Sequence, residues 1–347
     1  MSANATTSAK ASVDKPGSRS RVLSGMRPTG KLHLGHLVGA LHNWVELQDK
    51  YDCFYLVVDW HALTSGYADT SDIVANGYDM VADWIAAGID PEKSTIFVQS
   101  LVPEHAELFL LLSMVTPVPW LERVPTFKEQ QEQLSEKDLS TFGFLGYPLL
   151  QAADIIIYDA QYVPVGEDQV AHLELTREVV RRFHNFYGQL FVEPQPLLTK
   201  FPRLPGLDNR KMSKSYNNAI DLADDDETIR KKVMQMYTDP KRVRADTPGT
   251  VEGNPVFMYH DAFNPDVAEV EDLKVRYRLG KVGDVEVKKK LAAALNAYLE
   301  PMRARRAELL ARPDTLRDIL HDGSRKARAI AHETMERVRS AVKLKYS

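Results

Sequence analysis

The sequence of 347 residues contains a single cysteine, Cys53, so it has no internal disulfide framework and no zinc site built on cysteines. Cys53 lies in the apolar run 53–58, which predicts a buried thiol in a reducing compartment. No apolar stretch approaches the roughly 18 residues of a membrane span. The formal net charge of −4 gives no overall attraction for nucleic acid, so any RNA contact must come from local basic faces. We therefore expect a cytoplasmic protein without a membrane association.

Residues 1–20 almost lack large apolar side chains and are rich in Ser, Ala, Thr and Lys. Such a segment buries too little surface to offset the entropy lost on ordering, so we expect a disordered N-terminal tail. The alternative is an organelle-targeting peptide, because the segment contains few acidic residues, but it lacks an Arg-rich amphipathic pattern. The rest of the chain shows no internal repeat and no zinc signature.

What the remaining chain does contain is an alternation of strand and helix patterns, with 44% hydrophobic residues available for a core. Strands separated by helices predict a doubly wound parallel sheet, that is, an α/β Rossmann-like domain. In such sheets ligands bind at the carboxyl ends of the strands. The expected strands are 22–25, 53–58 and 95–98, and the expected helices are 37–47, about 72–87 and about 104–115.

The segment 27–36, Arg-Pro-Thr-Gly-Lys-Leu-His-Leu-Gly-His, forms the turn from the first strand into the first helix. Backbone N–H groups at a helix start favour an anion, and Gly30 and Gly35 permit a ligand to approach the backbone closely. His33 and His36 add two ring donors, three residues apart, that reach the same phosphate region without a metal. Two surface histidines at a helix start are the alternative for this motif taken alone.

A second motif, Lys211-Met212-Ser213-Lys214-Ser215, follows about 175 residues later in a polar, turn-rich loop. Its two lysines are point charges suited to phosphate. An ordinary solvated basic loop is the alternative, but the presence of both motifs in this order favours nucleotide binding.

Together the two motifs resemble the HIGH and KMSKS signatures of the class I aminoacyl-tRNA synthetases. Further stretches are similar to those of the bacterial-type tryptophanyl-tRNA synthetases, and the resemblance runs from about residue 21 to the C-terminus. It implies a ligase that activates L-tryptophan with ATP and transfers it to the 3′ end of tRNA(Trp), with Mg²⁺ carried by ATP, no metal held by the protein, and a homodimer. The further stretches are 24–30, 58–62, 147–154, 163–169 and 172–177.

The resemblance also assigns residues to ATP. The expected catalytic residues are His33, His36, Lys211 and Lys214, which would position the nucleotide and stabilise charge growing on the leaving pyrophosphate. Capping of the following helix is an alternative role for Glu167 and Asp168, because negative charge is favoured at a helix start. This chain has histidine at positions 33 and 36, where many tryptophan enzymes have Thr and Asn. The residues expected at ATP are Arg27, Pro28, Thr29, Gly35, His36, Gly166, Glu167, Asp168, Leu204, Lys211, Met212, Ser213, Lys214 and Ser215.

Tyr147, Gln151 and Asp154 are spaced i, i+4 and i+7 and share one face of a predicted apolar helix. A carboxylate there needs a partner, and an indole N–H, which only donates, suits Asp154. Pairing of Asp154 with a structural Arg or Lys is the alternative that the residues alone favour, whereas the resemblance favours tryptophan. The resemblance further implies that His61 and Gln169 contact tryptophan, and Gln151 stands where many relatives have Met. For His61, a strand-end turn without a ligand is an equal alternative.

After Ser215 the pattern becomes mainly helical, over 225–237 and 265–347. We expect a catalytic domain over 21–216 and a helical tRNA anticodon-binding domain over 217–347, with the last helices packed back on the catalytic domain. Each basic run in this region, such as Lys288-Lys289-Lys290, is by itself typical of a solvated helix face. As a whole the region resembles the anticodon-reading domain of the family, where phosphate contacts position and base contacts specify.

Three other functions fit parts of this pattern. A tyrosyl-tRNA synthetase has the same fold and motifs, although the string Gly166-Glu167-Asp168-Gln169 favours tryptophan. A small nucleotidyltransferase also carries the first motif, but it does not need the long helical region after the second. The third is a paralogue that binds tryptophan or RNA without charging tRNA, against which the two lysines of the second motif argue.

Overall fold

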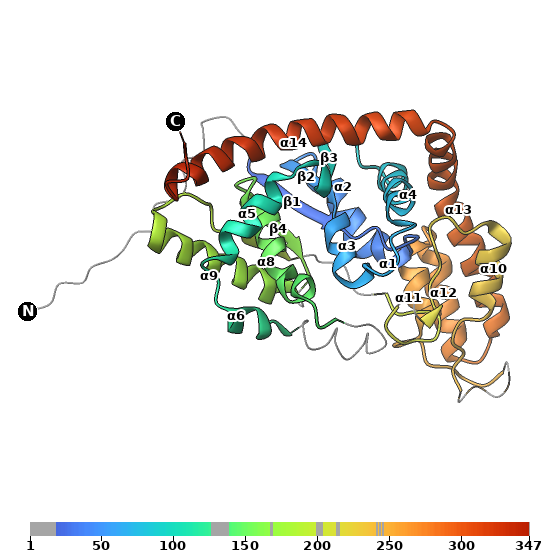
Figure 1. Cartoon of the computed structure of the whole chain (residues 1–347). Helices are drawn as coiled ribbons and strands as arrows, with labels where there is room; N and C mark the ends of the chain where they lie inside the picture. Colours follow the sequence, from blue (N-terminus) through green and yellow to red (C-terminus); the bar gives the residue numbers. More distant parts are fainter. Residues whose placement is uncertain are drawn as a thin grey trace, which may run out of the picture.

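The computed structural model describes residues 19–125, 139–166, 169–198, 204–212, 216–240, 242, 244 and 246–346. Within these residues, five parallel strands form one central sheet in the order β3-β2-β1-β4-β5 (Figure 1). The order reverses next to β1, so the crevice between β1 and β4 is the topological switch point. The strands are β1 (Arg21–Met26), β2 (Asp52–Val57), β3 (Ser94–Val98), β4 (Tyr162–Val165) and β5 (Gln195–Leu198).

Helices cover both faces of the sheet, which confirms the predicted doubly wound α/β fold (Figure 1). The first expected helix, 37–47, begins as a five-residue π-helical segment, η1, and continues as an α-helix, α2. The elements before residue 200 are α1 (Leu34–His36), η1 (Leu37–Leu41), α2 (His42–Leu47), α3 (Asp59–Gly66), α4 (Ile73–Ala86), the short 3₁₀ helix η2 (Gln99–Leu101), α5 (Glu104–Ser113), α6 (Val118–Glu122), α8 (Phe142–Ile156) and α9 (Val170–Tyr187).

Strand residues alternate between the two faces of the sheet, as the period of a strand requires. Val22 and Tyr55 pack into one apolar cluster, while Leu23 and Phe54 pack into the other. Cys53 is fully buried in the first cluster, and burial raises the pKa of its thiol to about 11, so the thiol stays protonated at neutral pH. The predicted buried cysteine is confirmed.

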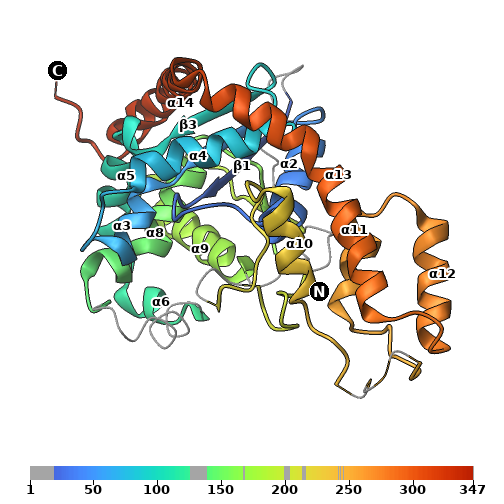
Figure 2. The same ribbon diagram turned by 90° about the vertical axis from the view of Figure 1, so that its right-hand side faces the viewer.

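From α10 to the first part of α13 the chain is mainly helical and lies to one side of the sheet (Figure 2). Helix α13 contacts α10 and α11 in this region and also contacts α4 beside the sheet. The link to α4 is ionic, because Arg306 Nε donates to Asp83 Oδ1 over 2.7 Å and the same guanidinium pairs with Asp79. The helices are α10 (Asp226–Met234), α11 (Pro255–Phe263), α12 (Val267–Arg278), α13 (Asp284–Leu310) and α14 (Pro313–Ala341).

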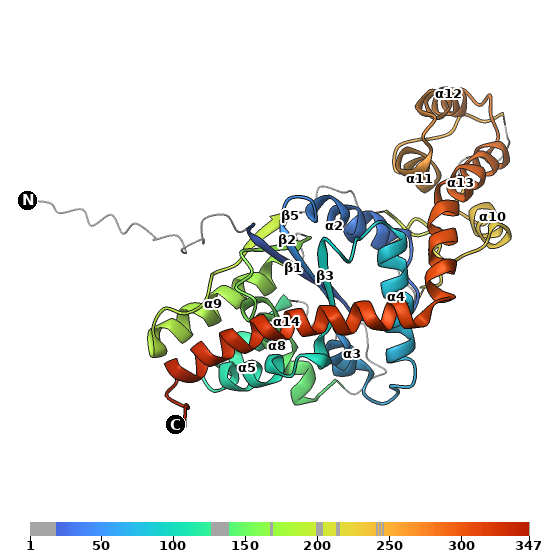
Figure 3. The same cartoon turned by 90° about the horizontal axis from the view of Figure 1, so that it is seen from above.

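The last helix, α14, returns to the sheet and lies along its edge strand β3 (Figure 3). The N–H of Val98 donates to Ser324 Oγ over 3.2 Å. Gly323 lies so close to the strand that a Cβ at this position would meet the Ile96 carbonyl oxygen at 1.8 Å. The helix thus covers the strand edge that the sheet leaves open on this side. In the part of the chain that is described, no helix is both long and apolar enough to cross a membrane.

Candidate functional site

A cavity of about 410 Å³, here called the central cavity, opens at the carboxyl ends of β1 and β4. Strand β1 contributes Gly25 and Met26, and β4 contributes Val165. The opposite wall comes from α3, α8 and the start of α9. The cavity therefore occupies the switch point of the sheet, where ligands bind in open α/β folds.

The structure brings together at this cavity all the residues that the sequence analysis assigned to the amino acid. Tyr147, Gln151 and Asp154 lie on the inner face of α8, one below the other, as their spacing predicts. His61 comes from α3, directly after β2, and Gln169 precedes α9. Two residues assigned to ATP, Arg27 and Gly166, also line the central cavity.

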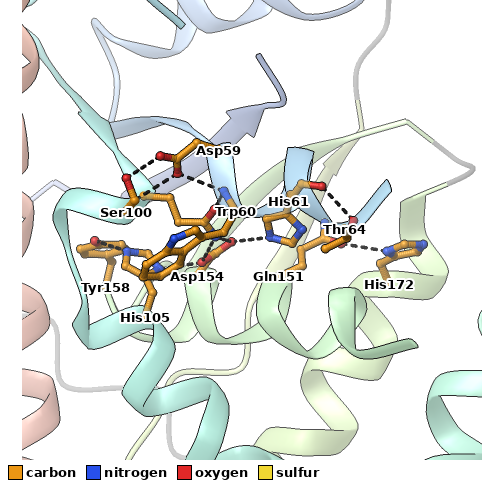
Figure 4. A network of polar contacts seen from close by, with 11 residues as sticks. Asp59, Trp60, His61, Thr64, Ser100, His105, Gln151, Asp154, Tyr158 and His172 are labelled. Carbon is orange, nitrogen blue, oxygen red and sulfur yellow. Dashed lines mark hydrogen bonds and ion pairs between the residues drawn. The ribbon is translucent and has the colours of Figure 1, made fainter. Parts of the chain in front are cut away.

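Asp154 is buried and accepts hydrogen bonds from three side chains (Figure 4). His61 Nε2 lies 2.8 Å from Oδ2, and His105 Nδ1 lies 2.6 Å from Oδ1. Gln99 Nε2 lies 2.8 and 2.9 Å from the two oxygens. Among the described residues, the charged partners of this carboxylate are histidines, and no arginine or lysine pairs with it. The alternative of a structural Arg or Lys partner is therefore wrong for these residues.

The charge state of Asp154 follows from two opposing influences. Burial disfavours a carboxylate and by itself raises the pKa. His105 and His61 donate to the ionised form and outweigh burial, so the pKa of Asp154 falls to about 2. The cavity therefore presents a negative, acceptor-only group at neutral pH.

His105, Gln99 and Tyr158 form the far side of this network, and the sequence analysis did not assign them. His105 Nε2 lies 2.7 Å from the Tyr158 hydroxyl, and all three side chains are buried. Gln99 and His105 follow β3, 55 and 49 residues before Asp154 in the sequence. The sequence did contain a signal for Gln99 and His105, because they follow a predicted strand, and polar residues at the end of a strand belong to the ligand edge of a parallel sheet.

The first motif forms a capped helix start. Leu34 begins α1, and His33 Nδ1 accepts the N–H of Gly35 over 3.1 Å. His36 Nδ1 in turn accepts the N–H of His33 over 3.2 Å, and the two ring centroids lie 3.8 Å apart. Because each Nδ1 accepts a hydrogen bond from a backbone N–H, each neutral ring carries its own hydrogen on Nε2. The pair is thereby fixed in the tautomer that donates through Nε2.

The second motif lies against the first. A Cβ at Gly35 would be 2.9 Å from Met212 Sδ, so the absence of a side chain at Gly35 lets the methionine approach. The chain after the second motif also pairs with the chain around the first. Leu34 N donates to Ile220 O over 3.0 Å, and Leu222 N donates to Leu32 O over 2.9 Å. Two segments far apart in sequence therefore form one surface.

The loop that carries Lys211 is closed on itself. Pro205 and Lys211 form an isolated antiparallel bridge, and Asn218 Nδ2 donates to Lys211 O over 3.1 Å. Leu204, which precedes this bridge, is buried.

In the first motif, the N–H of Thr29 donates to Arg27 O over 2.9 Å, and Pro28 between them is buried. Five assigned residues, Glu167, Asp168, Ser213, Lys214 and Ser215, lie outside the described residues.

A doubly wound sheet with a cavity at its switch point, next to a helix start that carries two oriented histidines, defines a nucleotide-binding α/β protein. The family described as "tRNA synthetases class I (W and Y)" matches residues 15–300, and the chain belongs to this family.

The chain is similar to tryptophan–tRNA ligases along nearly its whole length. The tryptophan–tRNA ligase of Thermotoga maritima is 51% identical over 329 residues, which cover 94% of this chain and 100% of that protein. The tryptophan–tRNA ligase of Treponema pallidum is 50% identical, with 93% of this chain and 97% of that protein covered. A crystal structure of tryptophanyl-tRNA synthetase from Campylobacter jejuni complexed with ADP and tryptophan matches with a TM-score of 0.85 and 34% identity, covering 93% of this chain and 99% of that chain. The predicted family is confirmed.

Proposed function

We propose that the chain is a tryptophan–tRNA ligase, which activates L-tryptophan with ATP to tryptophanyl-adenylate and pyrophosphate and then transfers tryptophan to the 3′ end of tRNA(Trp). The observation that carries the proposal is the buried, ionised Asp154 on the wall of the central cavity. An acceptor-only group in an otherwise largely apolar cavity suits an indole, whose N–H is a donor only. Membership of the tryptophan and tyrosine family supports this assignment.

In the first step the tryptophan carboxylate attacks the α-phosphorus of ATP and pyrophosphate leaves. The nucleophile is ionised at neutral pH, so no side-chain base is required. Catalysis then consists of positioning the reactants and stabilising charge that grows on the phosphoryl oxygens. His33 and His36, with Lys211 and Lys214, are the residues that we assign to this stabilisation.

The remaining contacts to ATP are assigned in the same way. The Nε2 atoms of His33 and His36, beside Gly35, and the side chain of Arg27 face the phosphates in this proposal, and Asp168 accepts hydrogen bonds from the ribose. Mg²⁺ enters as part of the substrate MgATP, because phosphate oxygens are the hard ligands that this ion prefers. The other contacts assigned to ATP are Pro28, Thr29, Gly166, Glu167, Leu204, Met212, Ser213 and Ser215.

Selection of tryptophan rests on Asp154 together with Tyr147, Gln151, His61 and Gln169. Phenylalanine offers no N–H to the carboxylate. Sites built to hydrogen-bond a substrate group reject an analogue that lacks it by about 10⁴–10⁵-fold. Because three protein side chains already donate to Asp154, phenylalanine leaves it only partly unpaired, and we expect the lower end of that range, about 10⁴-fold.

The second step needs the tRNA, whose terminal ribose hydroxyl attacks the adenylate carbonyl. We assign residues 217–347 to the tRNA, with the anticodon bound by the helices beyond the sheet, and residues 21–216 to the chemistry. The contact of α13 with both α4 and α10 supports a mechanical connection between the two functions. A cytoplasmic location fits both the tRNA partner and the buried reduced thiol of Cys53.

We further propose that the enzyme is a homodimer that buries an apolar surface formed by α5, α6, α8 and α9. Large apolar side chains on these neighbouring helices are exposed, an arrangement typical of a protein interface. Sedimentation of Met114→Glu, compared with wild type, tests this, since a charge at the interface should release monomers. The exposed side chains are Leu110, Met114, Val118, Phe142 and Phe186, with exposed fractions of 53, 69, 51, 68 and 60%.

The experiment that tests the function is ATP–pyrophosphate exchange with tryptophan, tyrosine and phenylalanine, using wild type and Asp154→Asn. We expect exchange with tryptophan and a large loss of kcat/KM in the variant, because an amide no longer presents two acceptor oxygens to the indole and its histidine partners. Exchange with tyrosine instead would identify a tyrosyl enzyme. Tryptophan binding without exchange would identify a non-charging paralogue.

A further inference from the structure

The Gln151 side chain is held at its carbonyl end. Gln151 Oε1 lies 2.8 Å from His172 Nδ1, and His172, which comes from α9, lies at the opposite end of the drawn network from His105 (Figure 4). Because the ring nitrogen donates to the amide oxygen, the amide nitrogen Nε2 is directed toward the cavity that Gln151 lines. Among the described residues Nε2 donates to no protein acceptor. The site therefore contains an oriented N–H donor without a partner in the part of the chain that the structure describes.

This donor stands beside the Asp154 carboxylate. Residues three apart on a helix are neighbours, roughly 5–6 Å between Cβ atoms, and both side chains line the same wall. The wall thus presents one acceptor, Asp154, next to one donor, Gln151. Tryptophan uses only the acceptor, because its ring has an N–H and no acceptor nitrogen.

We propose that Gln151 is a specificity-determining residue that recognises a ring acceptor placed next to the indole N–H. The substrate class that fits is a tryptophan analogue with a ring nitrogen at position 7, which presents a donor and an acceptor side by side. Such a nitrogen loses a hydrogen bond to water on entering an apolar pocket, and the Gln151 amide replaces that bond. This inference rests on the proposed activation of tryptophan and specifies which analogues the same site accepts.

The test compares kcat/KM for pyrophosphate exchange with tryptophan, 7-azatryptophan and 4-azatryptophan. In Gln151→Met, which keeps the side-chain length and removes the amide, we expect the 7-azatryptophan to tryptophan ratio to fall about five- to tenfold, the effect of one neutral hydrogen bond. The 4-azatryptophan ratio should stay unchanged, because its ring nitrogen lies away from the N–H. Using ratios cancels any general loss of activity in the variant.

A second variant keeps Gln151 and removes its anchor. His172→Phe frees the amide to rotate, and we expect the same ratio to fall by a smaller factor. If Gln151→Met fails to fold, as judged by circular dichroism, the ratio measured with His172→Phe is the test of the inference. Equal ratios in wild type and in the folded variants would overturn the inference. Absence of exchange with tryptophan in wild type would instead contradict the proposed function, so the two failures are distinct.

Discussion

His105 links the Asp154 carboxylate to the Tyr158 hydroxyl, with Nδ1 2.6 Å from Asp154 Oδ1 and Nε2 2.7 Å from the hydroxyl. The tyrosine fixes the far nitrogen of the ring, so the near nitrogen is directed at the carboxylate. His105 does not line the central cavity, and its influence on a ligand passes through Asp154. It is therefore a positioning residue.

Replacing His105 by Ala should raise the pKa of Asp154, because burial then outweighs the remaining donors. In wild type the pKa of about 2 keeps the carboxylate ionised between pH 5 and 8, so KM for tryptophan should show no increase toward pH 5 from this group. In His105→Ala we expect KM to increase as the pH is lowered from 8 to 5, with a smaller effect on kcat. The measurement is pyrophosphate exchange across this pH range.

Tyr158→Phe is the matched control, since it keeps the His105 ring and removes only its partner. In Tyr158→Phe we expect KM for tryptophan to increase toward low pH by less than in His105→Ala and by more than in wild type. Parallel KM profiles for wild type and His105→Ala would show that His105 does not set the ionisation of Asp154.

Asp83 gives a second pH prediction, this time for stability. Burial outweighs Arg306 and raises the pKa of this carboxyl from 3.8 to about 6. Folding therefore favours the protonated form, and this contribution to stability is lost as the pH rises from about 4 to 6. Urea unfolding of wild type and Asp83→Asn between pH 4 and 7 should show the free energy of unfolding of wild type falling by about 2–3 kcal/mol relative to the variant. A difference that does not change with pH would contradict this.

Lys288 should contribute to stability far more than its neighbour Lys289. Lys288 Nζ is buried and donates to Met236 O over 2.6 Å and to Thr238 Oγ over 2.8 Å, just beyond α10. Lys288→Met leaves these acceptors unpaired, and we expect a loss of about 2 kcal/mol in urea unfolding. Lys289 is exposed, so Lys289→Met should change stability by less than about 0.5 kcal/mol. Similar losses in both variants would be evidence against this role.

Gly323→Ala should detach α14 from the sheet edge. The added Cβ would meet the Ile96 carbonyl oxygen at 1.8 Å, which backbone atoms cannot accommodate without movement. We expect a loss of about 3 kcal/mol on thermal unfolding, at the upper end for overpacking. Gly143→Ala is the control, because a Cβ there meets nothing within 4 Å and alanine favours helix. Equal melting temperatures for Gly323→Ala and wild type would refute the close contact.

Local patterns predicted the parallel sheet, because each strand and helix carries its own hydrophobic period. The spacing of Tyr147, Gln151 and Asp154 likewise predicted one helical face, and all three line the central cavity. His105 could not be assigned in this way, since its contact with Asp154 depends on how β3 and α8 meet in space. The basic run 288–290 shows the same limit, because the sequence does not reveal that Lys288 is buried while Lys289 is exposed.

The contact between Val98 and Ser324 spans 226 residues, which has a consequence for synthesis on the ribosome. Strand β3 leaves the exit tunnel long before α14 is translated, so the edge of the nascent sheet stays open throughout that interval. Open strand edges pair readily with other chains. A fragment ending before residue 313 would keep this edge exposed permanently, and the edge strand is therefore covered only when α14 has been translated.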